Sequence, residues 1–357
     1  MKIKQLFLSV AIMLTVGLTT NAQTKNVDLD NFRCPVTYRL IPTKPLNPLF
    51  FTYSVQVNAS KSTENRVSLS NLEDGIYIEG QQKVNKDESP FLSIVVNLGN
   101  LIVTESNIRE NKEEKKDKEG KITTTYSYHV EVKYNFESSY KFFQGDNVLT
   151  TSHSFKSSTI HNYISKIFKN RKEAVDFWNN NKDVLIPQFT SELSAKTVNE
   201  ASYHATRWYG FYITKETEVI QITDTKKHTE NEAFKAICAS VKENFGTMTP
   251  NERLKKEDME EAIEYFKSIP DRYTDIKLKS DIKLRYAAYY NLCKIYLYLE
   301  DLENVHHYAD LLIQNGHDKK DGEKLKKSAD ELKEMLSRTE IKTRHFNPED
   351  HFGENQE

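Results

Sequence analysis

The amino-acid sequence predicts an α+β protein, with an antiparallel, β-sandwich-like domain at the N-terminal end and an α-helical domain after it. Three observations lead to this prediction. Short alternating apolar segments separated by turn residues fill residues 35–155, and apolar residues at helical spacing follow them. The clearest pattern is a pair of matched helical stripes between Ala287 and Gly316. With 357 residues, the chain is long enough for two or more separate cores.

The first residues are typical of a signal peptide. Lys2 and Lys4 precede an uncharged, mostly apolar stretch from Leu6 to Leu18, and a small polar run follows as far as Ala22. Because the apolar stretch is short for a bilayer span, we expect cleavage after Ala22 and an exported mature chain without a transmembrane segment. A lipid anchor at Cys34 is the rival interpretation, but a lipid-modified cysteine directly follows the apolar region, and Cys34 lies behind a polar segment.

Changes in residue pattern divide the chain into five predicted parts. They are a signal peptide over 1–22, a strand-rich β domain over 23–157, a helical region with a short hairpin over 158–250, helical repeats with a capping helix over 251–340, and a polar tail over 341–357.

The β domain is predicted from several short strands. Alternation around Tyr53, Val55 and Val57 predicts one strand, and the apolar run from Leu92 to Val96 predicts a buried one. Ile76 and Ile78, after a turn pair, predict another.

A hairpin and a charged loop complete the predicted β domain. Residues 122–136 and a run ending at Phe155 flank a turn over 144–147, which predicts a hairpin. Residues 111–121 are almost wholly charged and of mixed sign, so we expect a solvated loop there.

Helical spacing dominates after Phe155. Residues 160–168 carry apolar side chains at i, i+3, i+4, i+7 and i+8, which predicts an amphipathic helix. A second helix is expected over 187–208 and an inserted hairpin over 209–222. Residues 234–245 resume the helical stripe, with Gly246 as the expected C-cap.

Two tightly joined helices are predicted between Ala287 and Gly316, with a polar break at Glu300 and Asp301. A further helix over residues 323–336, apolar on one side and charged on the other, is expected to cap them.

These C-terminal residues resemble the tetratricopeptide repeat over roughly 258–336. Residues 289–292, Tyr296 and the turn at 299–301 are similar to one repeat, and residues 262–266 are similar to the second helix of a preceding one. Cys293 and Val305 depart from the family pattern, and an ordinary helical bundle is the alternative.

The resemblance implies stacked helix pairs with a groove that receives a partner segment. The residues expected to face this groove are Tyr290, Asn291, Lys294 and Tyr298.

The whole chain also resembles a group of exported bacterial envelope proteins of uncharacterised function. The residues that carry this resemblance are 38–42, 77–80, 226–228, 318–322 and 344–346. It implies a periplasmic or outer-membrane-associated protein and transfers no activity.

Charge, cysteine and histidine content indicate no nucleic-acid partner, metal or cofactor. The formal net charge is only -2, so there is no basic field for nucleic acid. Cys238 and Cys293 lie on apolar helical faces and are expected in the core, with one bridge or a reactive thiol as alternatives. His306 and His307 are adjacent on a helix and point about 100° apart, which does not suit joint metal binding.

Two classes of function are compatible with these sequence features. The first is a non-enzymatic interaction or scaffold protein of the cell envelope that binds a protein partner through its helical-repeat surface. The second is a carbohydrate-binding accessory protein that uses the aromatic-rich β domain, because the chain holds 19 tyrosines and 18 phenylalanines. No serine elbow, metalloprotease motif or phosphate loop points to an enzyme, although a triad assembled by the fold would leave no such spacing.

Overall fold

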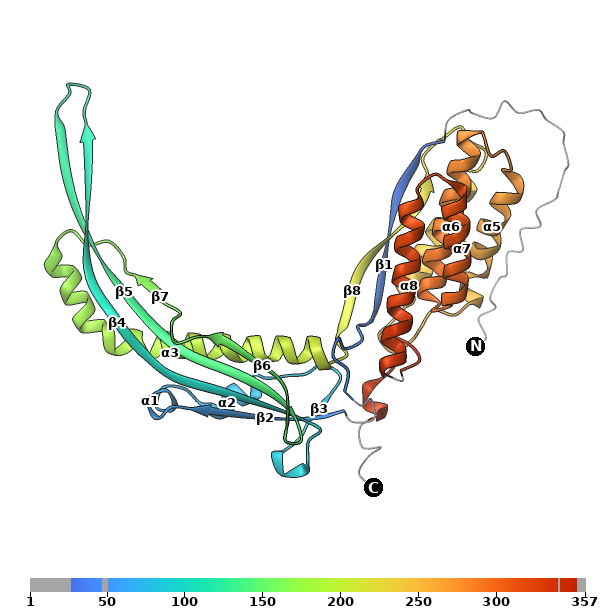
Figure 1. Cartoon of the computed structure of the whole chain (residues 1–357). Helices are drawn as coiled ribbons and strands as arrows, with labels where there is room; N and C mark the ends of the chain where they lie inside the picture. Colours follow the sequence, from blue (N-terminus) through green and yellow to red (C-terminus); the bar gives the residue numbers. More distant parts are fainter. Residues whose placement is uncertain (1–26, 47–50, 340, 352–357) are drawn as a thin grey trace, which may run out of the picture.

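The computed structural model describes residues 27–46, 51–339 and 341–351, and the predicted signal peptide lies outside these ranges. Figure 1 shows a curved sheet with one long helix, a bundle of helices, and a two-stranded ribbon that runs along the bundle. The mixed α+β class is therefore confirmed, with a sheet region first and a helical region last. No helix among the described residues is long and apolar enough to cross a membrane.

The sheet lobe is built around two strands that far exceed the usual length of about 3–10 residues. These are β4 (Leu92–Lys116) and β5 (Ile122–Gln144), which pair antiparallel. The strand order is β3-β2-β4-β5-β6, and β7 also pairs with β5. The remaining elements of this lobe are β2 (Thr52–Ala59), α1 (Lys61–Glu64), α2 (Leu69–Asp74), β3 (Gln82–Lys83), η1 (Lys86–Glu88), β6 (Asn147–Phe155) and β7 (His161–Ile164).

One long helix, α3 (Arg171–Tyr209), covers one face of this sheet. Alternate residues of β5 are buried in the core that the sheet shares with α3, and Tyr134 stacks on Phe189 with ring centroids 4.7 Å apart. The predicted sandwich of two sheets is not confirmed, because a helix forms the second layer here. Alternating apolar and polar residues indicate a strand with one buried face, but they do not indicate whether a sheet or a helix covers that face.

Residues 160–168 form no helix, contrary to the sequence prediction. His161–Ile164 is β7, paired with β5, and Phe168 makes a further bridge to Tyr128. Ile160, Ile164 and Ile167 are exposed, so the apparent helical stripe mixes exposed and buried side chains. Pairing with the outer edge of β5 outweighs the helical spacing in this segment.

The charged run at 111–121 is mostly strand rather than loop. β4 continues to Lys116 and β5 begins at Ile122, so only residues 117–121 form the turn. This hairpin projects as an arm, in Figure 1 at the upper left. Within the charged run, ion pairs join Lys112 to Glu114 and Lys115 to Glu113 along β4. Just before the run, cross-strand ion pairs join β4 to β5, from Glu105 to Lys133 and from Arg109 to Glu131.

The helical lobe confirms the predicted pair of helices, since α5, α6, α7 and α8 pack successively. At the predicted break, Glu300 has a φ of 58° and the Asp301 side chain accepts from the Asn304 N–H at 3.2 Å. Gly316 ends the second helix with a φ of 77°. The helices are α4 (Asn231–Thr247), η2 (Glu257–Met259), α5 (Glu260–Arg272), α6 (Lys279–Tyr298), α7 (Leu302–Asn315), α8 (Lys319–Thr339) and η3 (Pro348–His351).

Two predictions, for Gly246 and for the strand at Ile76 and Ile78, are wrong, whereas the predicted capping helix is present. Gly246 lies inside α4 rather than capping it, and the buried Ile76 and Ile78 lie in a connection rather than a strand. The predicted capping helix lies within α8, with Leu325 and Leu332 buried.

The ribbon joins strands that lie far apart in the sequence, β1 (Leu29–Arg39) and β8 (Ile213–Thr223). The predicted hairpin over 209–222 is therefore a single strand whose partner lies near the start of the chain. Cys34, Val36 and Ile220 of the ribbon are buried in the core of the helical lobe. Cys238 and Cys293 are buried in the same core, and all three cysteines are free thiols.

Asn291 of α6 holds the outer edge of β8. Its Oδ1 accepts from the Gln221 N–H at 2.7 Å and its Nδ2 donates to the Gln221 carbonyl at 2.8 Å. The side chain is fully buried, and its amide takes the place of a third strand at this point. The ribbon is thereby fastened to the helices by hydrogen bonds as well as by apolar contacts.

Replacing Asn291 with alanine should destabilise the protein by about 2–4 kcal/mol, because it removes the partner of the half-buried Gln221 N–H and leaves the Gln221 carbonyl with the weak 3.6 Å contact from Cys238 Sγ. Urea unfolding followed by circular dichroism measures this change. Asn180→Ala, on an exposed turn of α3, is the control and should have little effect. Equal midpoints for the two variants would contradict the role assigned to Asn291.

The residues after α8 dock at the junction of the two lobes, and we name residues 343–351 the C-terminal segment. The Arg39 N–H donates to the Arg344 carbonyl at 2.9 Å, and the Phe346 N–H donates to the Pro250 carbonyl at 3.0 Å. The Arg344 guanidinium pairs with Glu300 at 3.0 Å in a buried site. The part of the predicted polar tail that the structure describes is therefore anchored.

Burial lowers the pKa of His345. Its Nδ1 donates to the Thr249 carbonyl at 2.7 Å, while its Nε2 is buried with no hydrogen-bond partner among the described residues. The charged groups that act on it are Glu300, Arg344 and Arg253. Protonation at Nε2 would place a charge in this site, so the docked segment disfavours the imidazolium.

Because the pKa of His345 is lower in the folded chain than in the unfolded one, the unfolded chain binds more protons as pH falls below about 6.5. The contribution of neutral His345 to the free energy of unfolding is therefore fully present above about pH 6.5 and is lost as the pH falls below that value. Wild type should lose about 1 kcal/mol more than His345→Gln between about pH 7.5 and about pH 5.5 in urea unfolding. His153→Gln, at an exposed histidine, should behave like wild type, and identical pH profiles for all three proteins would refute the assignment.

Candidate functional site

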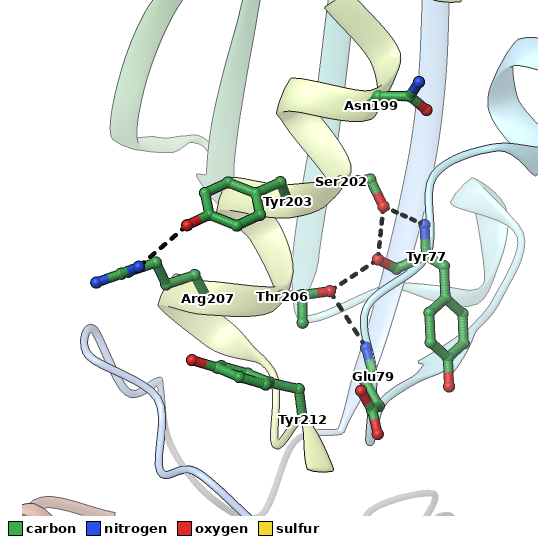
Figure 2. Close-up of a pocket in the computed structure, with 8 residues that line it drawn as sticks. All are labelled: Tyr77, Glu79, Asn199, Ser202, Tyr203, Thr206, Arg207 and Tyr212. Atoms are coloured by element: carbon green, nitrogen blue, oxygen red, sulfur yellow. Dashed lines mark hydrogen bonds between the residues drawn. The ribbon is translucent and has the colours of Figure 1, made fainter. Parts of the chain in front are cut away.

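A cavity of about 340 Å³ opens between the last turns of α3, the segment 76–80 and the start of β8. We name it the tyrosine pocket, and Figure 2 shows its side chains. Its lining residues are Tyr77, Glu79, Asn199, Ser202, Tyr203, Thr206, Arg207 and Tyr212. Its volume lies near the lower end of the range of about 300–1,000 Å³ for small-molecule sites.

Two hydroxyls of α3 hold the wall of the pocket in place. Ser202 Oγ accepts from the Tyr77 N–H at 3.0 Å and donates to the Tyr77 carbonyl at 2.9 Å. Thr206 Oγ1 donates to the same carbonyl at 3.0 Å and accepts from the Glu79 N–H at 3.4 Å. Residues four apart lie on one face of a helix, so this pair can bind an extended strip of backbone.

The aromatic rings at the rim are open to solvent. Tyr77 is 57% exposed and Tyr203 is 58% exposed. The guanidinium of Arg207 donates from Nη1 to the Tyr203 hydroxyl at 3.0 Å, and this contact orients both groups. The rim therefore offers flat apolar surface next to a fixed cation.

A carboxylate is fixed on the opposite wall. Glu79 Oε1 accepts from the Ile213 N–H at 2.9 Å, and among the described residues Oε2 has no hydrogen-bond partner. The pocket thus holds one acceptor carboxylate, one donor guanidinium and the amide of Asn199, with tyrosine rings between them. This arrangement suits the recognition of an amphipathic ligand that carries several hydroxyl groups.

The residues predicted to face a partner lie elsewhere, on the face of α6 that contacts the ribbon. Asn291 binds Gln221, and Lys294 Nζ lies 2.5 Å from Glu218 of β8. Tyr290 is partly buried and lies under Lys294.

Tyr298 is buried on the same side of α6, between Tyr38 and Phe245. Glu218, Lys294, Tyr298 and Arg344 also border a smaller cavity of about 200 Å³. The four predicted residues are thus gathered on one helix face, but the protein's own ribbon occupies that face. A partner at this surface would have to displace the ribbon.

No pattern in the sequence predicted the tyrosine pocket. Its residues come from three separate segments around 77, 203 and 212, so no spacing along the chain connects them. The available signals were the high tyrosine content and residues 77–80, which carried the whole-chain resemblance.

A methyl group at position 210 should distort the pocket. A Cβ there would lie 2.8 Å from the Thr206 carbonyl oxygen and 2.9 Å from the Glu79 carbonyl oxygen. We expect Gly210→Ala to cost about 1–3 kcal/mol of stability, measured by thermal unfolding. Gly246→Ala is the control: its Cβ would make an ordinary contact with Pro35 Cγ at 3.9 Å and its helical position favours alanine, so it should be neutral or slightly stabilising. A Gly210→Ala variant as stable as wild type would show that the wall yields easily.

Comparisons with known proteins show no family for this chain. No protein-family model matches it, and no curated protein matches it. Similar solved structures include a minor lipoprotein from Acinetobacter baumannii, at 12% identity and a TM-score of 0.19, covering 43% of this chain and 92% of that one. Another is a neuraminyllactose-binding hemagglutinin homologue from Helicobacter pylori, at 10% identity and a TM-score of 0.19, covering 45% of this chain and 94% of that one. Neither similarity establishes a common fold at these TM-scores.

Proposed function

We propose that this protein is a non-enzymatic binding protein of the bacterial cell envelope, and that its ligand is a carbohydrate held in the tyrosine pocket. The observation that carries the proposal is the pair of exposed rings, Tyr77 and Tyr203, at the rim of a cavity with fixed polar groups. The basic and apolar N-terminal residues support export.

The chemistry of the pocket matches that of a sugar. A pyranose presents an apolar C–H face and a ring of hydroxyl groups, so it can lie on a tyrosine while its hydroxyls exchange hydrogen bonds. Glu79 can accept a hydrogen bond from a sugar hydroxyl through Oε2, and the side chains of Arg207 and Asn199 can donate to sugar oxygens. The cavity volume of about 340 Å³ suits one or two sugar rings better than a folded partner.

A glycan array probed with the mature chain tests this function, followed by calorimetry with the oligosaccharide that gives the strongest signal. Tyr77→Ala and Tyr203→Ala should each weaken binding about tenfold, which corresponds to about 1.4 kcal/mol for a stacking contact. Tyr126→Ala is the matched control, because Tyr126 is also exposed, at 47%, but lies on the arm away from the pocket.

Silence of the mature chain on every glycan would refute the carbohydrate proposal. Binding that survives both pocket substitutions would locate the sugar site elsewhere on the protein.

A protein partner on the tetratricopeptide-like helices is the second proposal. What supports it is that α6 already holds an extended segment, β8, through Asn291 and Lys294. A partner strand could be held in the same way if it replaced the ribbon. Crosslinking in intact cells, with the crosslinked peptides mapped to residues 279–298, distinguishes this proposal from the sugar site.

A further inference from the structure

We propose that the C-terminal segment is a positioning element of the tyrosine pocket, so that its docking and ligand binding in the pocket favour each other. The ligand half of this inference rests on the proposed carbohydrate function. The structural half rests on a chain of contacts from Phe346 and Pro348 to Glu79 and Tyr212.

Phe211 is the first link, since it directly precedes the pocket residue Tyr212. Its ring packs edge to face on Phe346, with centroids 5.2 Å apart. Its N–H donates to the Glu79 carbonyl at 2.8 Å, and the side chain is only 4% exposed. Phe211 therefore touches both the C-terminal segment and the pocket wall.

Arg39 is the second link, and its buried guanidinium ties three segments together. Nε donates to the Phe346 carbonyl at 2.9 Å, Nη1 to the Phe211 carbonyl at 3.0 Å, and Nη2 to Asn251 Oδ1 at 3.0 Å. The planar guanidinium fixes the directions of these three bonds relative to one another. Movement of Phe346 would therefore remove one of the three bonds that fix the guanidinium to which the Phe211 carbonyl is bound.

Gly80 is the third link, next to the pocket carboxylate of Glu79. A Cβ at this position would lie 2.9 Å from Phe211 Cβ and 3.4 Å from Pro348 Cγ. Its φ is 78°, a conformation that suits glycine. The backbone that carries Glu79 is thus packed directly against Phe211 and the C-terminal segment.

Two pocket residues depend on these contacts for their position. The Leu40 N–H donates to the Tyr212 carbonyl at 2.9 Å, and the Ile213 N–H donates to Glu79 Oε1 at 2.9 Å. When the segment undocks, Phe211 keeps the ring of Phe51 at 5.4 Å but loses that of Phe346. Arg39 loses one acceptor at the same time, so Glu79 and Tyr212 can shift. A ligand that binds only the ordered pocket must then stabilise docking by the same factor by which docking improves its affinity.

Hydrogen exchange in the full mature chain tests the structural half. Phe346→Ala should make the amides of Phe211 and Ile213 exchange about tenfold faster, while amides in α7 keep their wild-type rates. Glu349→Ala is the control, because this exposed residue lies in the same segment. Phe346→Leu keeps apolar bulk and should restore much of the protection. Unchanged exchange at Phe211 and Ile213 in Phe346→Ala overturns the inference.

Calorimetry with the oligosaccharide of strongest array signal tests the ligand half. Phe346→Ala should bind it several-fold more weakly, and the bound oligosaccharide should slow exchange of the Phe346 amide in wild type. Equal affinity for wild type and Phe346→Ala would overturn the coupling and leave the proposed function intact. If wild type binds no oligosaccharide, the proposed function and the ligand half both fail, and the exchange rates at Phe211 and Ile213 decide the positioning role alone.

Discussion

The pairing of β1 with β8 is the constraint on which the rest of this structure depends. It brings Phe32 opposite Ile220, although these residues are 188 positions apart. The buried side of the ribbon completes the core of the helical lobe, and Asn291 satisfies its outer edge. The end of β1 delivers Arg39 to the junction, and the start of β8 delivers Tyr212 to the tyrosine pocket. One pairing thus organises both the fold of one lobe and the site at the edge of the other.

Local patterns predicted the elements whose partners are close in sequence. The hairpin of β5 and β6 and the helix pair α6 and α7 are of this kind, because their apolar faces meet across short connections. The strand at 213–223 was recognised as extended, but the pattern contained no information about β1 as its partner. Residues 160–168 were misassigned because Ile160, Ile164 and Ile167 are exposed apolar residues, which a count of apolar spacing treats as buried.

The candidate site also depends on contacts between residues that are distant in the sequence. The sequence grouped Asn291, Lys294 and Tyr298 correctly on one face of a helix, since that grouping depends only on helical geometry. That the face would be filled by the protein's own ribbon depends on tertiary contacts. The tyrosine pocket forms where the connection at residues 76–80, the end of α3 and the residue before β8 come together. Apolar periodicity along the chain carries no information about such tertiary contacts.

The helical lobe is built from two separate parts of the sequence, β1 and the residues from β8 onward. The whole sheet lobe, residues 51–209, is an insertion between the two strands of the ribbon. This insertion is contiguous, so it can fold before the ribbon closes, whereas β1 must wait for a partner that lies some 180 residues later in the chain. The contacts of β1 have high sequence separation and therefore form slowly. The helical lobe is thus expected to close last, when Arg344 reaches Glu300 and the final residues dock.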